Sequence, residues 1–364
     1  MRTPLVGMLT TLTAGRGFGE QSPLFRALLR SARQERCRAY VFTPEGVNWE
    51  TGTVRGWTAG RGGWRRSNHR LPDVVYDRIV NRRDARRPPV AQAVRRLKAR
   101  YHGRYFNPTF LDKWDVYQCL WTEPAMRAHL PATFLFAGVE TVREVACRWP
   151  LIYMKPRSGT QGQQVVRLER LTADPDGAYR VRSPGRVAGR RVSGLQAAVD
   201  MAGAGDDFVV QQGIEVPGRR RRPFDVRGLL HRDGAAGWRL TALVARIGRS
   251  RGITSNLHTG GTAKAARSFL RLLYRGQPGR AEQALSRLRA LALAVPPPIE
   301  QRFGPFGELG VDMVLDLQGQ PWFLEANARP GRRALVLARA WRERRLAGRR
   351  IFRYARSLVE GDDA

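Results

Sequence analysis

Lysine is scarce in this sequence. Of 364 residues, only Lys98, Lys113, Lys155 and Lys264 are lysine, whereas sixty are arginine, and with 31 acidic residues the formal net charge is +33. A polyanionic partner such as nucleic acid, a polyacidic peptide or an anionic wall polymer would be attracted to this charge. A compositional bias towards arginine would produce the same charge without any partner. We favour the bias, and do not expect nucleic acid as a partner, because aromatic and basic residues are not interleaved as in RNA-binding sheets.

Cysteine is also scarce, and long apolar runs are missing. Three cysteines without a CxxC spacing exclude a disulfide framework and a zinc site of the usual kind. The five histidines form no cluster spaced for a metal. No run of eighteen apolar residues occurs, so we expect no membrane span. The N-terminal apolar stretch is broken by threonines and is interpreted as a first strand rather than a signal peptide. These absences predict a cytoplasmic protein.

The patterning of the chain predicts several α+β units. A hydrophobic content of 42% over this length is sufficient for two or three cores. Strands and helices are expected to alternate up to about residue 105, with strands at 5–9, 38–43 and 74–80. Long helical stretches are expected at 110–130 and at 263–295, the second ended by three prolines. The expected units are an N-terminal α/β domain at 1–106, a small subdomain at 107–207, a large subdomain at 208–345 and a basic C-terminal helix or tail at 346–364.

Acidic and amide side chains recur near the C-terminal end of the chain, in an alternating apolar pattern over 310–327. Asp312 lies on one expected strand, and Glu325 and Asn327 share a face of the next. A two-residue turn at 318–319 would place Asp312 directly opposite Glu325, and a three-residue turn would offset them. Facing carboxylates destabilise a sheet unless a cation lies between them. An all-oxygen set of this kind suits Mg²⁺ that also holds phosphates, so we favour a metal site over a solvated hairpin face.

A glycine-rich loop follows another expected strand. Lys155 ends an apolar segment and is followed by Gly159 and Gly162. Glycines let backbone N–H groups approach phosphate oxygens, and a lysine at the strand end reaches them as a point charge. The spacing is not that of a Walker loop. Because arginine replaces lysine easily on a solvated surface, a lysine retained here indicates a need for a compact ammonium group.

Two arginines on an expected hairpin are further candidates for the site. Arg227 shares a strand face with Asp225, and Arg246 lies on the partner strand. A cross-strand ion pair on the surface is one interpretation. The other is that both arginines stabilise phosphate or a developing acyl phosphate. Asn256 follows in a polar loop whose glycines allow close approach of a ligand.

The ordered combination of these motifs resembles the ATP-grasp superfamily, and most closely the YheC/YheD-like family of spore-associated ATP-grasp proteins. The resemblance extends from Val6-Gly-Met-Leu-Thr10 through Pro72-Asp-Val-Val-Tyr-Asp-Arg78 to Asn327-Ala-Arg-Pro-Gly331. The hairpin and the loop Asn256-Leu-His-Thr-Gly-Gly261 are also similar to ribosomal-protein glutamate ligases. This implies an ATP-grasp fold of two α+β lobes that grip ATP, preceded by a Rossmann-like domain.

Residue roles carried over from the resemblance fall into three groups. The residues implied to bind the nucleotide are Lys113, Lys155, Gly159, Gly162 and the adenine hinge Gln211-Gln212-Gly213-Ile214, where ligases often have Gln-Glu. Those implied to hold Mg²⁺, with Mn²⁺ as an alternative ion, are Asp312, Glu325 and Asn327. Those implied to lie near the phosphates and the activated intermediate are Arg227, Arg246 and Asn256.

The function implied by the resemblance is ATP-dependent ligation of a carboxylate, on a small molecule or a peptide, to an amine acceptor through an acyl phosphate. A non-enzymatic alternative is an ATP-binding or spore-coat protein whose basic surface, including Arg219–Arg222, adheres to an anionic polymer. A third hypothesis is a phosphotransferase acting on an alcohol or polyanion. The sequence identifies neither substrate nor the oligomeric state.

Overall fold

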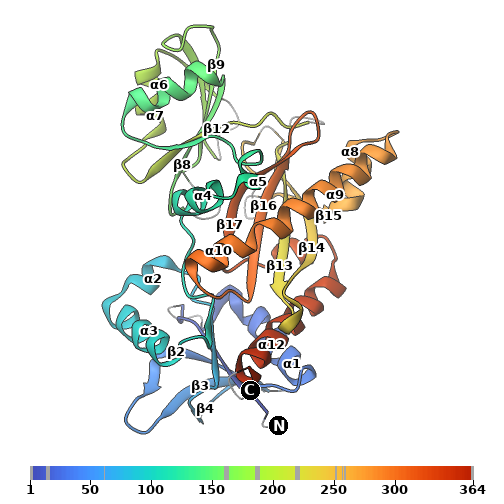
Figure 1. The fold of residues 1–364 in the computed structure, drawn as a ribbon. Coiled ribbons are helices and arrows are strands. Elements are labelled where there is room, and N and C mark those ends of the chain that lie inside the picture. Colours follow the sequence, from blue (N-terminus) through green and yellow to red (C-terminus); the bar gives the residue numbers. More distant parts are fainter. Residues whose placement is uncertain are drawn as a thin grey trace.

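The computed structural model describes residues 3–13, 17–60, 62–159, 164–184, 189–217, 222–250, 252–255, 257 and 260–361. Three sheets form the frame of the molecule (Figure 1): the first is mixed, and the second and third are antiparallel. The first sheet lies at the bottom of that view, the second at the top and the third between them. In the described part of the chain, no helix is long and apolar enough to cross a membrane.

The first sheet has the order β4-β3-β2-β1-β5-β6, and β1 pairs in parallel with both β2 and β5. The prediction of a strand at 5–9 is confirmed, the expected strand at 74–80 ends at Asp77, and the segment 51–70 forms a hairpin. Alternating apolar side chains of the strands are buried beneath the helices. The elements are β1 (Leu5–Leu9), α1 (Ser22–Gln34), β2 (Arg38–Asn48), β3 (Thr53–Gly60), β4 (Gly63–Arg70), β5 (Val74–Asp77), α2 (Arg82–Arg86), α3 (Pro88–Arg100) and β6 (Tyr105–Phe106).

The second sheet has the order β11-β10-β9-β8-β12-β7 and carries two helices on one face (Figure 1). The helices contribute Val142, Val145 and Ala198 to a core with Ile152 and Val210 of the sheet. Strands β9 and β10 pair as an antiparallel hairpin. The elements are β7 (Thr133–Leu135), α6 (Val139–Arg148), β8 (Leu151–Pro156), β9 (Val166–Arg170), β10 (Ala178–Arg182), β11 (Arg190–Ser193), α7 (Leu195–Ala202) and β12 (Phe208–Gln212).

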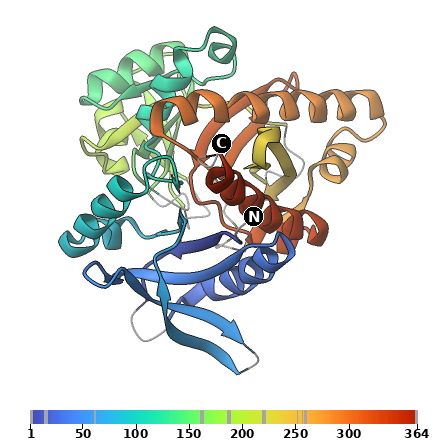
Figure 2. The ribbon, with the colours of Figure 1, turned by 60° about the horizontal axis from the view of Figure 1, so that its bottom comes forward.

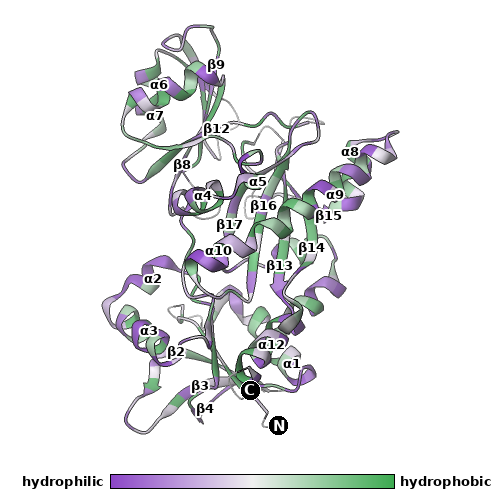
Figure 3. Cartoon of the chain, viewed as in Figure 1, coloured by the Kyte–Doolittle hydropathy of each residue, from purple (hydrophilic) through white to green (hydrophobic). Residues whose placement is uncertain are grey.

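The third sheet has the order β15-β14-β13-β16-β17, and apolar residues recur along β13, β14 and β16 (Figure 3). Helix α9 covers it, with Leu285 and Leu288 packed against Val311 and Met313. The elements are β13 (Phe224–Arg232), β14 (Trp238–Ile247), β15 (Thr262–Ala265), α8 (Ala266–Leu273), α9 (Pro278–Ala294), α10 (Pro296–Phe303), β16 (Glu308–Leu315), β17 (Pro321–Asn327) and α11 (Arg333–Leu337).

Two long helices expected from the sequence are wrong as single elements. The segment 110–130 is divided into α4 (Lys113–Trp121) and α5 (Pro124–Arg127), because Pro124 cannot continue a helix but fits its first turn. The segment 263–295 begins as strand β15 and is interrupted at Gly276, which has a left-handed φ of 84°. The predicted end is confirmed, since α9 stops at Ala294, just before the three prolines. The prolines themselves form the first turn of α10, where a missing N–H group costs no helical hydrogen bond.

The C-terminal helix α12 (Trp341–Glu360) returns to the N-terminal sheet and lies beside α1 (Figure 2). Its Ile351 and Phe352 are fully buried in one core with Val6 and Phe25. Gly348 allows the close approach of the two helices, since a Cβ there would lie 2.5 Å from Ser31 Oγ. Helices α4 and α5 pack in the core of the third sheet rather than the second. The expected domain boundaries themselves stay a prediction.

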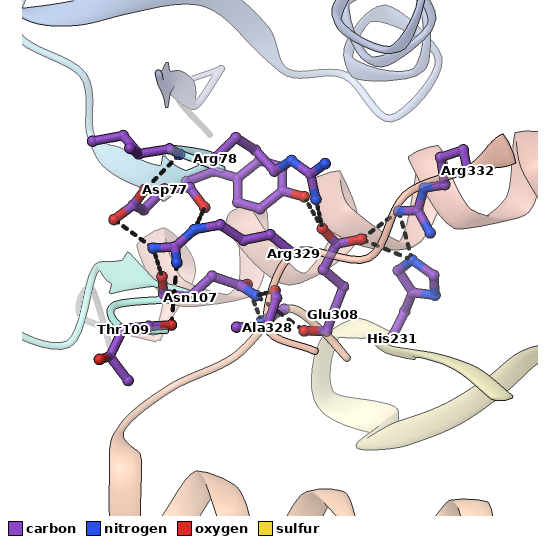
Figure 4. A network of polar contacts seen from close by, with 12 residues as sticks. Asp77, Arg78, Asn107, Thr109, His231, Glu308, Ala328, Arg329 and Arg332 are labelled. Carbon is purple, nitrogen blue, oxygen red and sulfur yellow. Dashed lines mark hydrogen bonds and ion pairs between the residues drawn. The ribbon is translucent and has the colours of Figure 1, made fainter. Parts of the chain in front are cut away.

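A buried charge network joins the first sheet to the third (Figure 4). Glu308, at the start of β16, is fully buried and accepts 2.5 Å hydrogen bonds at Oε1 from Tyr76 Oη and Arg78 Nη1. Its Oε2 accepts from Arg332 Nη2, which also lies 3.0 Å from His231 Nε2. The two arginines hold the pKa of Glu308 well below its usual range, even though burial alone would raise it. The carboxylate is therefore charged, and it links the two sheets.

A second set of contacts in the same region positions the segment after β17. Arg329 Nη2 pairs with Asp77 at 2.8 Å and donates to the carbonyl oxygen of Asn107, and its Nη1 donates to that of Thr109 (Figure 4). Asn107 adopts a φ of 58°, a conformation that asparagine tolerates better than most residues, and donates to the carbonyl oxygens of Glu308 and Ala328. The backbone next to Asn327 is thereby held against the N-terminal sheet.

His231 makes the stability of this network dependent on pH. Burial lowers the pKa of His231 to about 4, although Glu308 favours its charged form. The geometry agrees, because Nδ1 lies 2.7 Å from Thr241 Oγ1 and Nε2 accepts from Arg332, which fits a neutral ring. Since the unfolded chain takes up this proton at about pH 6.5, acidification from there to about pH 4 is expected to lower the free energy of unfolding by up to about 3 kcal/mol.

The measurement is urea unfolding of the wild type and of His231→Gln at several pH values in this interval. The variant is expected to lose the part of the acid slope that His231 contributes. His102→Gln, at an exposed histidine, is the matched control and should leave the slope unchanged. Equal slopes in all three proteins would contradict the prediction.

Candidate active site

The hairpin of β16 and β17 pairs Asp312 directly with Glu325, as the sequence predicts for a two-residue turn. The turn, however, is longer than the two or three residues expected from the sequence. A five-residue loop at 316–320 joins the strands, and a register shift next to Asp312 restores the pairing. Asp316 organises this loop, because its Oδ1 accepts from the N–H groups of Gln318 and Gln320. The expected pairing is therefore confirmed, but a β-bulge produces it.

Asp312 is buried and bound by two arginines. Arg227 donates to it through Nε and Nη2, both at 2.6 Å, and Arg246 Nη2 lies 2.7 Å from its Oδ2. Arg246 also forms a bidentate pair with Asp225 at 2.5 Å, and Ser255 Oγ donates to the same carboxylate. Burial would raise the pKa of Asp312, but Arg227 and Arg246 hold it well below its usual range.

The sequence left two interpretations of Arg227 and Arg246, a surface ion pair and stabilisation of phosphate, and this arrangement excludes only the first. A surface ion pair is wrong, because the Arg246 and Asp225 side chains are 13% and 8% exposed. The pairs form in a region with little water, where charge–charge interactions are stronger than at the surface. Two arginines already lie beside Asp312, so the facing carboxylates do not by themselves require a metal ion.

The donor set nevertheless fits magnesium. Glu325 is 34% exposed, and its nearest partners are Lys113 Nζ at 3.9 Å and Asn327 Nδ2 at 3.3 Å. Its oxygens and the amide of Asn327 line one pocket, with Asp312 paired across the hairpin. Among the described residues, no three His, Cys, Asp or Glu side chains gather as a metal cluster. A site of two carboxylates and one amide oxygen leaves coordination positions open, as Mg²⁺ requires when it also binds phosphates.

The two predicted nucleotide lysines approach this pocket from different elements. Lys113, the first residue of α4, donates from Nζ to the carbonyl oxygens of Pro156 and Gly159 at 3.0 and 3.1 Å. Lys155, near the end of β8, donates to Gln211 Oε1 at 2.6 Å. Lys113 Nζ lies 3.9 Å from Glu325. Lys155 lies close enough to Glu325 and Lys113 for their charges to act on its pKa. The structure thus brings together Lys113, Lys155, Gly159 and Glu325.

The hinge residues surround Lys155. Gln211 pairs with Tyr153 of β8 and donates from Nε2 to Thr133 Oγ1, which fixes the amide orientation. Gln212 is bound through its backbone N–H and its side chain to Ala132, and the Gly213 N–H donates to Leu151 O. The Ile214 N–H has no hydrogen-bond partner among the described residues. The contacts of Gln212 hold the end of β12 against Ala132.

Lys155 carries a protonation equilibrium near physiological pH. Burial lowers the pKa of Lys155 to about 8, Glu325 opposes this shift and Lys113 adds to it. The unfolded chain holds this proton up to about pH 10.5, so the free energy of unfolding without nucleotide should rise between about pH 8 and 10.5. Nucleotide phosphates need the charged form. The affinity for ADP is therefore expected to fall, and proton uptake on binding to appear, as the pH rises through about 8.

Gln211→Glu tests this prediction, since it places a carboxylate where the amide oxygen lies 2.6 Å from Nζ. The expected result is a higher pKa of Lys155 and a loss of ADP affinity that begins at higher pH. Calorimetry in two buffers of different ionisation enthalpy measures affinity and proton uptake together. Lys264→Met, at an exposed lysine of β15, should behave as the wild type. Identical pH profiles for wild type and Gln211→Glu would contradict the assignment.

Other predicted residues lie outside the described residues, namely Gly162, Asn256 and most of the arginine run at 219–222.

Some residues that lie at this pocket were not predicted from the sequence. Asp112 caps the N-terminus of α4 by accepting from Trp114 N. It also pairs with Arg157 at 3.2 Å, which joins α4 to the glycine-rich loop after β8. An aspartate just before a helix is a capping signal that could have identified it. Arg82, which lines the pocket, has no such signal among sixty arginines.

The fold and these side chains together define the ATP-grasp class. The D-alanine–D-alanine ligase of Bacillus anthracis is similar to this chain, with a TM-score of 0.54 and 10% identity over 99% of this chain and 100% of the other. The ATP-grasp ligase PsnB, solved with a phosphomimetic variant of its minimal precursor, Mg and ADP, has a TM-score of 0.53 and 13% identity, over 96% and 98% of the two chains. At these identities the likeness establishes the fold alone.

Sequence comparison identifies the family. The pattern of the YheC/D-like ATP-grasp family matches residues 102–358. The endospore coat-associated protein YheD of Bacillus subtilis (strain 168) is 30% identical over 367 residues, which cover 98% of this chain and 79% of YheD. The chain therefore belongs to the YheC/D-like ATP-grasp family. The resemblance found in the sequence is confirmed, as is the ATP-grasp fold with its α+β composition.

Proposed function

We propose that this protein is a Mg-ATP-dependent ligase that joins a carboxylate to an amine through an acyl phosphate. The observation that supports this most directly is that Lys113 and Glu325, from two separate elements, line one pocket, and that the charges of both act on Lys155 of a third element. Structures of the same fold are named as ligases, and one of them holds Mg and ADP. The acid and amine substrates are not identified by these observations.

Each group of residues has a role in this proposal. Lys113 and Lys155 bind the phosphates, and the hinge from Gln211 to Ile214 binds the adenine edge. Asp312, Glu325 and Asn327 would hold Mg²⁺, which neutralises phosphate charge when bound. Arg227 and Arg246 lie at Asp312, where they orient its carboxylate and stabilise the charge that spreads over the transferring phosphoryl group. The acid's carboxylate oxygen attacks the γ-phosphorus, and ADP leaves as the bond to the β-phosphate oxygen breaks. The amine then attacks the acyl carbonyl, phosphate leaves, and the amine nitrogen gives up a proton to form the amide.

The test is ADP release from Mg-ATP in the presence of amino acids and acidic peptides, with analysis of all products. A ligase gives ADP, free phosphate and a new amide. ADP with a phosphorylated product and no free phosphate would instead establish the phosphotransferase. Tight binding of ATP without ADP release for any acid and amine would count against both reactions.

A non-enzymatic role is the second candidate, and one specific observation favours it. The relative YheD is named as endospore coat-associated, and this chain has a formal net charge of +33. A basic exterior would hold the protein on an anionic polymer of such a coat. Retention on an anionic matrix should then decrease with salt and be the same for wild type and Glu325→Gln. Absence of retention at low salt would exclude this role.

A further inference from the structure

A pocket extends from the proposed phosphate site to the N-terminal domain. Lys113, Glu325 and Asn327 line one part of it, and Arg82, Phe110 and Arg329 line another. Arg82 begins α2, directly after the first sheet, and none of the roles assigned above uses it. The pocket therefore has room beyond the phosphate-binding groups, on the side where a second substrate would meet the metal hairpin.

The two arginines of this pocket flank the same aromatic ring. The guanidinium carbons of Arg82 and Arg329 lie 4.7 and 4.3 Å from the centroid of Phe110. Arg329 is fully occupied by Asp77 and by backbone carbonyl groups. Its charge is neutralised by Asp77, so Arg329 and the ring act as a rigid support for Arg82.

Arg82 itself lacks a matching anion. Its Nη2 donates to Leu111 O at 2.6 Å, whereas Nε and Nη1 have no partner among the described residues. The side chain is half-buried, and burial together with the neighbouring Arg86 and Arg329 lowers its pKa. The nearest carboxylate, Asp112, already caps α4 and pairs with Arg157. A partly buried cation with unused donors is costly unless a ligand supplies the counter-charge.

We propose that Arg82 binds a second carboxylate of the substrate, so that the acid activated by this protein is a diacid or an acidic peptide. One spare guanidinium matches the single charge and planar shape of a carboxylate. The substrate's other carboxyl group would then reach toward Lys113 and Glu325 in the same pocket. This inference rests on the proposed ligase function for the reaction, but not for the binding of the anion.

The experiment measures anion binding without turnover. Succinate, glutarate and the monoacid butyrate are titrated by calorimetry into protein saturated with Mg-ADP, for wild type, Arg82→Met, Arg82→Lys and Arg86→Met. Arg86 lies on the same short helix, is exposed and does not line the pocket, so it controls for the loss of one charge. We expect at least one diacid to bind wild type and Arg86→Met roughly 10- to 100-fold more tightly than butyrate. Arg82→Met should abolish this preference, Arg82→Lys should keep part of it, and all four proteins should bind Mg-ADP equally.

Several results would overturn the proposal. These are an Arg82→Met variant that still prefers the diacid, a wild type that binds neither diacid better than butyrate, and a parallel loss of Mg-ADP affinity, which would assign Arg82 to the nucleotide. The two hypotheses also fail separately. If diacid binding depends on Arg82 but no ADP is released with any amine, the ligase function is refuted and the second-carboxylate site is not. ADP release from monoacids that is unchanged in Arg82→Met refutes the second-carboxylate site alone.

Discussion

Glu325→Gln is expected to abolish the tightening of ADP binding by Mg²⁺ and to lower ATP-dependent turnover roughly 100- to 1000-fold. The same change should alter the free energy of unfolding by less than about 1 kcal/mol. Glu325 is 34% exposed and its ion pair with Lys113 is 3.9 Å long, so the fold depends little on its charge. Its carboxylate faces the pocket, where a metal ligand must lie.

Calorimetry of ADP binding with and without Mg²⁺ measures the first effect even before a substrate is known, and urea unfolding measures the second. Glu343→Gln, on α12 and away from the pocket, is the control for loss of one negative charge. A substitution of Asp312 is a less suitable test of the metal site, because it would leave Arg227 and Arg246 without the counter-charge that they share. If Mg²⁺ still strengthens ADP binding in Glu325→Gln, the hairpin does not hold the metal.

Glu308→Ala is expected to lower the free energy of unfolding by about 3–5 kcal/mol. Glu308 is fully buried and is the counter-charge of Arg78, itself 2% exposed, and of Arg332. Removing it takes this acceptor from the Arg78 guanidinium and the Tyr76 hydroxyl, and leaves Arg332 beside the neutral ring of His231 without its counter-charge. Burial would raise the pKa of Glu308, but the two arginines hold it below its usual range, so at neutral pH the carboxylate is charged and the full effect should appear.

Urea unfolding at neutral pH is the measurement, with Glu300→Ala as the matched control. Glu300 pairs with Arg232 at 2.6 Å and accepts from Trp238, but the arginine is 30% exposed. Water can therefore solvate Arg232 after the change, and a loss of only about 1 kcal/mol is expected. Equal losses in the two variants would mean that the network between the sheets contributes no more than an ordinary surface ion pair.

Much of the site could be predicted because its pattern is local. Alternation along 310–327 identifies the faces of both strands, whereas the five-residue loop and the register shift that pair Asp312 with Glu325 were not predicted. Lys113 and Lys155 are noticeable because lysine is so rare in this chain. The helix boundaries were harder to predict, because a proline disrupts the interior of a helix but suits its first turn. The sequence around Pro124 and Pro296 does not show that each proline begins a new helix.

The sequence alone thus determined the family, the ATP-grasp fold and the two strands that carry Asp312 and Glu325, because periodicity and ordered motifs act over short distances along the chain. Only the tertiary structure decided which charges are buried and with whom they pair. Glu308 meets Arg78 across some 230 residues, and Asp312 meets Arg227 across 85. Among sixty arginines, nothing local distinguishes the one that faces a pocket from those that face water. That difference arises only when distant segments pack and exclude solvent, since burial is what gives a charge its energetic and chemical weight.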